Sequence, residues 1–128
     1  MTMSSPADIG TGPPPPNATQ REVSIPVRFA GGSGHLAGTL TVPDEPTGPM
    51  ANTVQLLVHG YSYSRYYWDF PYQPETYSYV HAAARAGYPT LAIDRLGDGR
   101  SSRPAGRLLT WQNAALTVAT AVTALRRG

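Results

Sequence analysis

The sequence predicts an α/β domain in which an antiparallel hairpin precedes a parallel strand–helix–strand unit and a final helix. Three observations carry this prediction. Apolar and polar residues alternate over 22–28, a nearly continuous apolar run occupies 54–58, and a helical pattern separates that run from a second apolar strand at 90–93. A helix between two buried strands is typical of a right-handed crossover, so these two strands are expected to be parallel.

The hairpin is the first predicted element. Glycine-rich residues 31–34 provide a flexible turn between two strands of alternating pattern. The apolar residues of the two strands are Val23, Ile25, Val27, Leu36, Leu40 and Val42. Residues 1–20 contain four consecutive prolines and little that could pack. We therefore expect a disordered Pro-rich leader over 1–20 and a domain over 21–128.

The strand–helix–strand unit and the last helix follow. The run at 54–58 suits a strand covered on both faces. A helix is predicted over 77–86 with Gly87 as its stop, and a longer helix begins after Thr110 as its N-cap. Trp111, at its start, is expected to pack, and Gly128 suits a C-terminal cap. The predicted apolar stripe of this helix comprises Ala115, Val118, Ala119, Val122 and Leu125.

Composition excludes several classes of function. The 128 residues suffice for one domain, and the ten basic residues, all arginine, are scattered, so no nucleic-acid partner is expected. The absence of cysteine excludes disulfides and thiolate chemistry. The longest mostly apolar segment, 114–125, is too short to span a membrane. No signal peptide is visible in the first ten residues, and the cellular location stays open.

Special residues end both buried strands of the crossover unit. His59-Gly60-Tyr61 follows the first strand, and the second leads into residues 94–101, with sequence DRLGDGRS. Ligands of open α/β sheets bind outside the carboxyl ends of the strands. If the strands are parallel, both segments lie at that edge.

The order of these elements and motifs resembles the opening half of the α/β-hydrolase fold. The likeness covers 22–128, and His-Gly followed by D-R-x-G-x-G-x-S on alternate strands is far more specific than His-Gly alone. The stretches YYWD at 66–69 and YSYV at 77–80 are similar to a branch of bacterial and fungal hydrolases of poorly defined substrate.

The resemblance implies a role for each motif. The backbone of Gly60 and Tyr61 would contribute to an oxyanion hole, with the Tyr61 N–H as donor. A second group would brace the two loops and not take part in catalysis: His59, Asp94, Arg95, Gly97, Gly99 and Ser101. Four aromatic residues either line an apolar substrate pocket or pack over the sheet edge: Tyr63, Tyr66, Tyr67 and Trp68.

No catalytic residue is expected in the chain itself. No G-x-S-x-G occurs, and in the resembled family the nucleophile, acid and base come later than this sequence extends. The resemblance therefore implies the N-terminal part of a serine esterase or lipase-type hydrolase, inactive alone, with a small-molecule substrate when complete and no cofactor or metal. Two alternatives stay open: a stand-alone non-catalytic module, and one half of a split enzyme completed by a partner chain. The isolated chain is also expected to self-associate through an exposed strand edge.

Residues 97–102 also resemble part of a dinucleotide-binding fingerprint. Ser102 stands where that fingerprint has glycine or alanine, and the segment follows a later strand. Nucleotide binding is therefore disfavoured.

Overall fold

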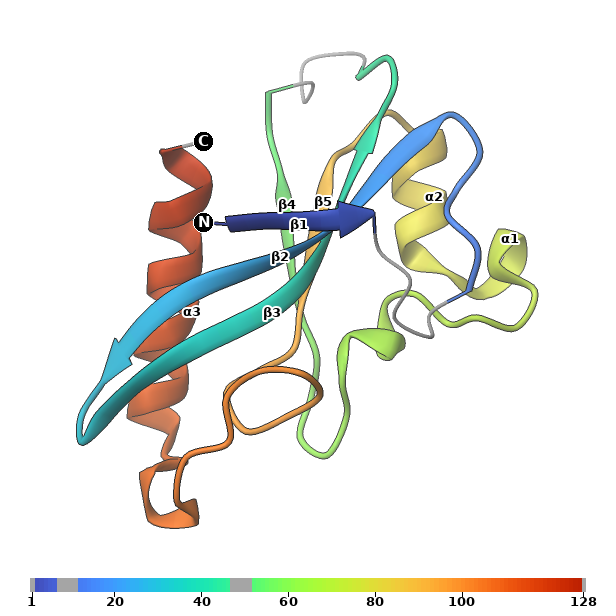
Figure 1. Cartoon of the computed structure of the whole chain (residues 1–128). Coiled ribbons are helices and arrows are strands. Elements are labelled where there is room, and N and C mark those ends of the chain that lie inside the picture. Colours follow the sequence, from blue (N-terminus) through green and yellow to red (C-terminus); the bar gives the residue numbers. More distant parts are fainter. Residues whose placement is uncertain (1, 7–11, 47–51, 128) are drawn as a thin grey trace.

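A computed structural model describes residues 2–6, 12–46 and 52–127 of the chain (Figure 1). A five-stranded mixed sheet runs in the order β1-β2-β3-β5-β4. The hairpin consists of β2 (Ala18–Phe29) and β3 (Gly32–Pro43), which pair antiparallel along their whole length. Gly31 forms its turn with a φ of 97°, a conformation that glycine adopts without steric cost.

The prediction of a disordered leader through Gln20 is wrong for the described residues. β1 (Thr2–Pro6) pairs antiparallel with β2, and β2 itself begins at Ala18. Gln20 is buried, and its amide donates a 3.0 Å hydrogen bond to Thr41 Oγ1. A long hairpin offers backbone partners at its open edge, which is how a segment without a core of its own becomes ordered. Residues 7–11 lie outside the described residues.

The crossover unit is parallel, as predicted. β4 (Gln55–Val58) pairs with β5 (Thr90–Ile93) in parallel, and β5 pairs with β3 antiparallel. Three short helices connect β4 to β5: η1 (Arg65–Tyr67), α1 (Pro74–Tyr77) and α2 (Tyr79–Arg85). The helix expected over 77–86 is therefore interrupted at Ser78, whose backbone is extended and whose hydroxyl caps α2 by accepting from the His81 N–H.

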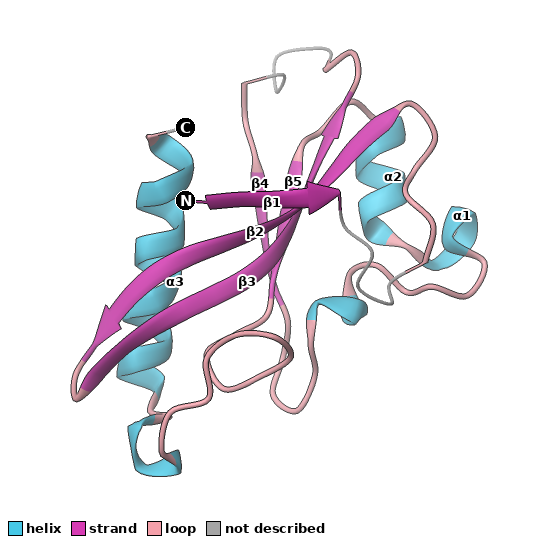
Figure 2. Cartoon of the chain, in the orientation of Figure 1, coloured by secondary structure: helices cyan, strands magenta, loops and turns pink. Residues whose placement is uncertain are grey.

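Helices cover both faces of the sheet, as Figure 2 shows, and β5 divides its side chains between them. Leu91 and Ile93 join the core beneath Ala121 of α3 (Trp111–Arg126). Ala92 points the other way and packs with Val80 of α2. This alternation explains why all four residues of β5 are buried.

The predicted N-cap of α3 is confirmed, but its predicted buried stripe is wrong in register. Thr110 Oγ1 accepts from the Asn113 N–H. The buried residues of α3 are Asn113, Thr117 and Ala121, whereas Ala115, Ala119 and Val122 are exposed and Val118 and Leu125 are half-buried. Trp111, expected to pack, is 77% exposed.

Asn113 supplies the physical reason for this register. Its side chain donates to the carbonyls of Ala30 and Leu108 and accepts from the Ala30 N–H at 3.0 Å, so it ties the hairpin tip and the short helix η2 (Gly106–Leu108) to α3. The spacing of apolar residues alone does not indicate such an inward-facing amide. Gly128 lies outside the described residues.

The last strand of the sheet, β4, is paired on one side only among the described residues. Among all the residues that the structure describes, no helix is both long and apolar enough to cross a membrane.

Candidate functional site at the carboxyl ends of β4 and β5

The loops that follow β4 and β5 start side by side, because Val58 and Ile93 are the last paired residues of the two strands. His59 directly follows β4, is buried, and joins the loops. The Arg95 N–H donates to His59 Nε2 at 3.0 Å, so Nε2 is unprotonated. His59 Nδ1 therefore carries the proton and donates to the Gly60 carbonyl at 2.7 Å. Both ring nitrogens are engaged by backbone groups, which leaves the ring unsuited to act as a base.

A tight turn follows His59. The Tyr63 N–H donates to the Gly60 carbonyl at 3.3 Å, and Ser62 takes a left-handed φ of 66° to close the turn. Tyr61, at the tip of this turn, is 88% exposed. Among the described residues, the Tyr61 N–H has no hydrogen-bond acceptor. An added Cβ at Gly60 would meet no atom within 4 Å, so the space beside this residue is open.

Arg65, which the sequence analysis did not single out, anchors the other end of the loop. Its backbone N–H donates to Asp94 Oδ1 at 2.8 Å, and its guanidinium contacts Asp94 Oδ2 through Nε at 3.0 Å and Nη2 at 2.8 Å. The same guanidinium pairs with Glu22 of β2 and donates to Thr39 of β3. Arg65 and Asp94 are 3% and 2% exposed, so this charge network lies inside the protein.

The network sets the protonation of its members. Burial alone would raise the pKa of Asp94, but hydrogen bonds from Arg65 and from the Arg100 N–H, with the charge of Arg65, hold it below the ordinary 3.8. Burial alone would lower the pKa of Arg65, and the contacts with Glu22 and Asp94 raise it instead. Both groups are therefore charged over the physiological range.

The loop after β5 folds around the Asp94 carboxylate. The Ser101 hydroxyl donates to the Asp94 carbonyl at 2.6 Å and accepts from the Ala37 N–H at 2.9 Å. Gly99 has a φ of 50°, and a Cβ there would lie 2.2 Å from Asp94 Cγ. Gly97 has a φ of 90° and packs under Leu109. No helix opens at these glycines, because α3 begins at Trp111, which removes the structural basis for a dinucleotide site.

The tyrosine-rich segment forms a row of edge-to-face ring contacts that runs from Tyr63 through Tyr67 and Trp68 to Tyr79. Trp68 packs against the small core between the sheet and α2, while Tyr63, Tyr66 and Tyr67 are exposed.

A buried polar pair joins this segment to α2. The Ser78 hydroxyl donates to Asp69 Oδ1 at 2.6 Å, so the sequence stretches 66–69 and 77–80 are in direct contact. Burial raises the pKa of Asp69 above 3.8, although the Ser78 hydrogen bond and the charge of His81 oppose the shift. Neither Asp69 nor Ser78 belonged to the predicted site, although both lie in the two stretches that carried the resemblance.

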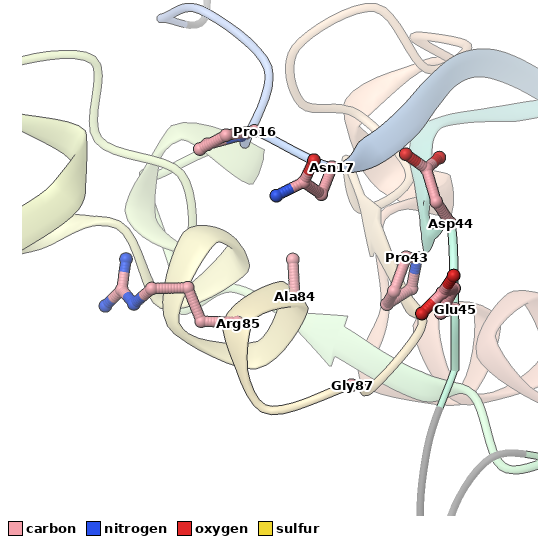
Figure 3. Close-up of a pocket in the computed structure, with 8 residues that line it drawn as sticks. All are labelled: Pro16, Asn17, Pro43, Asp44, Glu45, Ala84, Arg85 and Gly87. Atoms are coloured by element: carbon pink, nitrogen blue, oxygen red, sulfur yellow. The ribbon is translucent and has the colours of Figure 1, made fainter.

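One hollow adjoins this site, and a second lies away from it. One of about 180 Å³ lies beside Tyr61 and is lined by Tyr61, Arg95, Leu96, Asp98, Leu109, Thr110, Trp111 and Ala114. A larger hollow of about 700 Å³ lies near the start of β5, at the opposite edge of the sheet (Figure 3). It is lined by Pro16, Asn17, Pro43, Asp44, Glu45, Ala84, Arg85 and Gly87. Over residues 2–6, 12–46 and 52–127, no three acidic or histidine side chains form a group that could hold a metal ion.

Comparisons with known proteins agree with this architecture. The family model described as "Alpha/beta hydrolase family" matches residues 55–128, more than half of the chain. The crystal structure of the hypothetical protein PA2218 from Pseudomonas aeruginosa is similar, with a TM-score of 0.69 and 17% sequence identity. The similarity covers 98% of this chain and 36% of that one, and at this identity it shows the fold alone. A search of curated proteins found no match. The chain belongs to the α/β hydrolase family.

Proposed function

We propose that the chain forms the oxyanion-stabilising half of a serine-type carboxylic ester hydrolase. The nucleophile, the acid and the histidine base come from polypeptide outside these 128 residues, either from the same gene product or from a partner chain. The substrate is a small-molecule ester, and the 128 residues alone do not turn it over.

The observation that carries this proposal is the unpaired backbone N–H of Tyr61. It lies at the carboxyl edge of parallel strands, where α/β proteins bind ligands. When a nucleophile attacks an ester carbonyl, negative charge develops on the oxygen, and a fixed N–H lowers the energy of that state.

The fixed position of the turn supports the same proposal. His59 ties its start to the Arg95 backbone, and Arg65 ties its end to Asp94. A donor held by buried contacts on both sides loses little entropy on stabilising a transition state, whereas a donor on a mobile loop would first have to be ordered.

The test compares the chain with a completed protein. The DNA beyond codon 128 and the neighbouring genes would be read for an apolar strand followed by G-x-S-x-G, and the completing polypeptide expressed as an extension or a partner. We expect hydrolysis of p-nitrophenyl acetate and labelling by a serine-directed phosphonate only in the completed protein. Turnover and labelling of the 128 residues alone would contradict the proposal. So would completion that yields no turnover, or the absence of any nucleophile motif in that DNA.

A further inference from the structure

The 180 Å³ hollow beside Tyr61 lies between the two candidate loops and the start of α3. Tyr61, Arg95, Leu96 and Asp98 form its loop side, and the other wall is Leu109, Thr110, Trp111 and Ala114. The residue that offers a free N–H thus also lines a cavity. Tyr61 therefore belongs both to the turn and to the hollow.

Both walls are anchored to the body of the protein. Leu109 lies over Gly97, where a Cβ would approach Leu109 Cδ2 to 2.8 Å, so the glycine sets how deep this side chain can sit. Thr110 and Asn113 fix the first turn of α3. On the other wall, the Arg95 N–H is held by His59. Binding pockets are typically formed in advance by such supports.

The lining combines large apolar side chains with Thr110 and two charged residues, Arg95 and Asp98. Tyr61, Leu109 and Trp111 are large apolar side chains that are 88%, 46% and 77% exposed, and they meet around one hollow. Exposed apolar groups gathered at a concave surface mark a ligand site more often than scattered ones do. Arg95 and Asp98 have opposite charges, so they give the hollow no net preference for an ion.

We propose that this hollow receives a single aromatic ring, carried on one side of the ester bond whose carbonyl oxygen faces the Tyr61 N–H. The inference deepens the proposed function and rests on it. An apolar cavity of roughly 150 Å³ holds benzene, so the volume of about 180 Å³ here suits one ring. Tyr61 and Trp111 can contact a ring edge-to-face or offset, a preference that aliphatic groups do not share.

The test measures ring binding without requiring turnover. The chain contains two tryptophans, Trp68 and Trp111, so labelling with 5-fluorotryptophan gives two ¹⁹F resonances, which Trp111→Phe assigns. Benzyl alcohol is the probe, with n-butanol as the aliphatic comparison. We expect benzyl alcohol to shift the Trp111 resonance saturably and to leave Trp68 unchanged, and n-butanol to bind at least several-fold more weakly.

Neighbouring alanines of α3 provide a matched pair of variants. Ala114 lines the hollow, whereas Ala115 is exposed and does not. Ala114→Leu fills the cavity and is expected to weaken benzyl alcohol binding at least tenfold, while Ala115→Leu should stay within about twofold of the parent chain. Equal effects of the two variants, a shift of both tryptophans, or no saturable shift of Trp111 would overturn the inference.

The readout separates this inference from the proposed function. Ring binding in the chain, combined with no ester turnover in the completed protein, would leave the pocket standing and remove the function. Turnover of p-nitrophenyl acetate by the completed protein, combined with no ring binding, would support the function and remove the ring pocket.

Discussion

Arg65 contacts Asp94 at three points, through its backbone N–H, Nε and Nη2, and all three contacts are buried. One residue therefore holds the loop after β4 against the residue that ends β5. The same guanidinium reaches Glu22 in the hairpin. The position of the candidate oxyanion turn thus depends on a charge network shared by three strands.

Asp94→Asn is expected to lower the free energy of unfolding by about 3–5 kcal/mol, because removing one partner leaves a buried charge incompletely paired. Urea denaturation measures this change. Asp44→Asn, at an exposed position, is the matched control and should change stability by less than ~0.5 kcal/mol. Equal effects of the two substitutions would show that the network contributes little.

The same carboxylate also predicts a pH dependence. The folded pKa of Asp94 is below 3.8, so the ionised carboxylate stabilises the fold above pH 3.8. That contribution is lost as the pH falls through the lowered folded pKa. In Asp94→Asn this acid-side loss should be absent. A variant whose stability still falls as steeply below 3.8 as the parent's would assign the loss to another group.

Asp69 predicts a change of stability with pH in the opposite direction, at pH values above 3.8. Burial raises its folded pKa above 3.8, so the contribution of Asp69 to stability is greatest below pH 3.8 and is lost as the pH rises through the folded pKa. Asp69→Asn keeps an acceptor for the Ser78 hydroxyl and removes the buried charge. We expect this variant to be at least as stable as the parent near neutrality and to lose the slope above 3.8, measured by the urea midpoint against pH. A less stable variant with an unchanged slope would contradict this assignment.

Gly99→Ala is expected to destabilise the fold by more than about 2 kcal/mol, because its Cβ would overlap the Asp94 carboxylate and its φ is 50°. Gly106→Ala is the control, since a Cβ there meets nothing within 4 Å. Thermal unfolding of the two variants measures the difference. Similar melting temperatures would mean that the loop after β5 adapts at little cost.

The open edge of β4 predicts self-association of the isolated chain. Unpaired strand edges with apolar neighbours are common sites of aggregation, and β4 is paired on one side only in the described part of the chain. Size-exclusion chromatography over a range of concentrations should show oligomers whose share increases with concentration. A chain that stays monomeric at every concentration would favour a stand-alone module.

Much of the fold could be predicted because its signals are local. Alternation in the hairpin, the apolar run before His59 and the Thr110 cap each act within a few residues. The buried face of α3 could not be predicted, since Asn113 and Thr117 face inward through contacts made with the distant hairpin tip. Apolar periodicity cannot show which polar side chains will find partners.

Some residues of the candidate site could likewise be predicted from the sequence, and others could not. The His59, Asp94 and Ser101 positions came from motifs, and the structure places all three at one edge of the sheet. Arg65 could not be singled out, because nothing in its neighbourhood distinguishes it from nine other arginines. Its partners, Glu22 and Asp94, are brought to it only by the pairing of strands far apart in the sequence.

The rate of ester hydrolysis by Tyr61 variants of the completed protein tests the central claim most directly. Tyr61→Pro deletes the backbone N–H, and kcat for p-nitrophenyl acetate should fall on the order of 10²–10³-fold. Tyr61→Phe keeps the N–H and the ring, and its kcat should stay within a few-fold of the parent's. A large loss in Tyr61→Phe, or a kcat for correctly folded Tyr61→Pro close to the parent's, would contradict the claim that this backbone N–H stabilises the transition state.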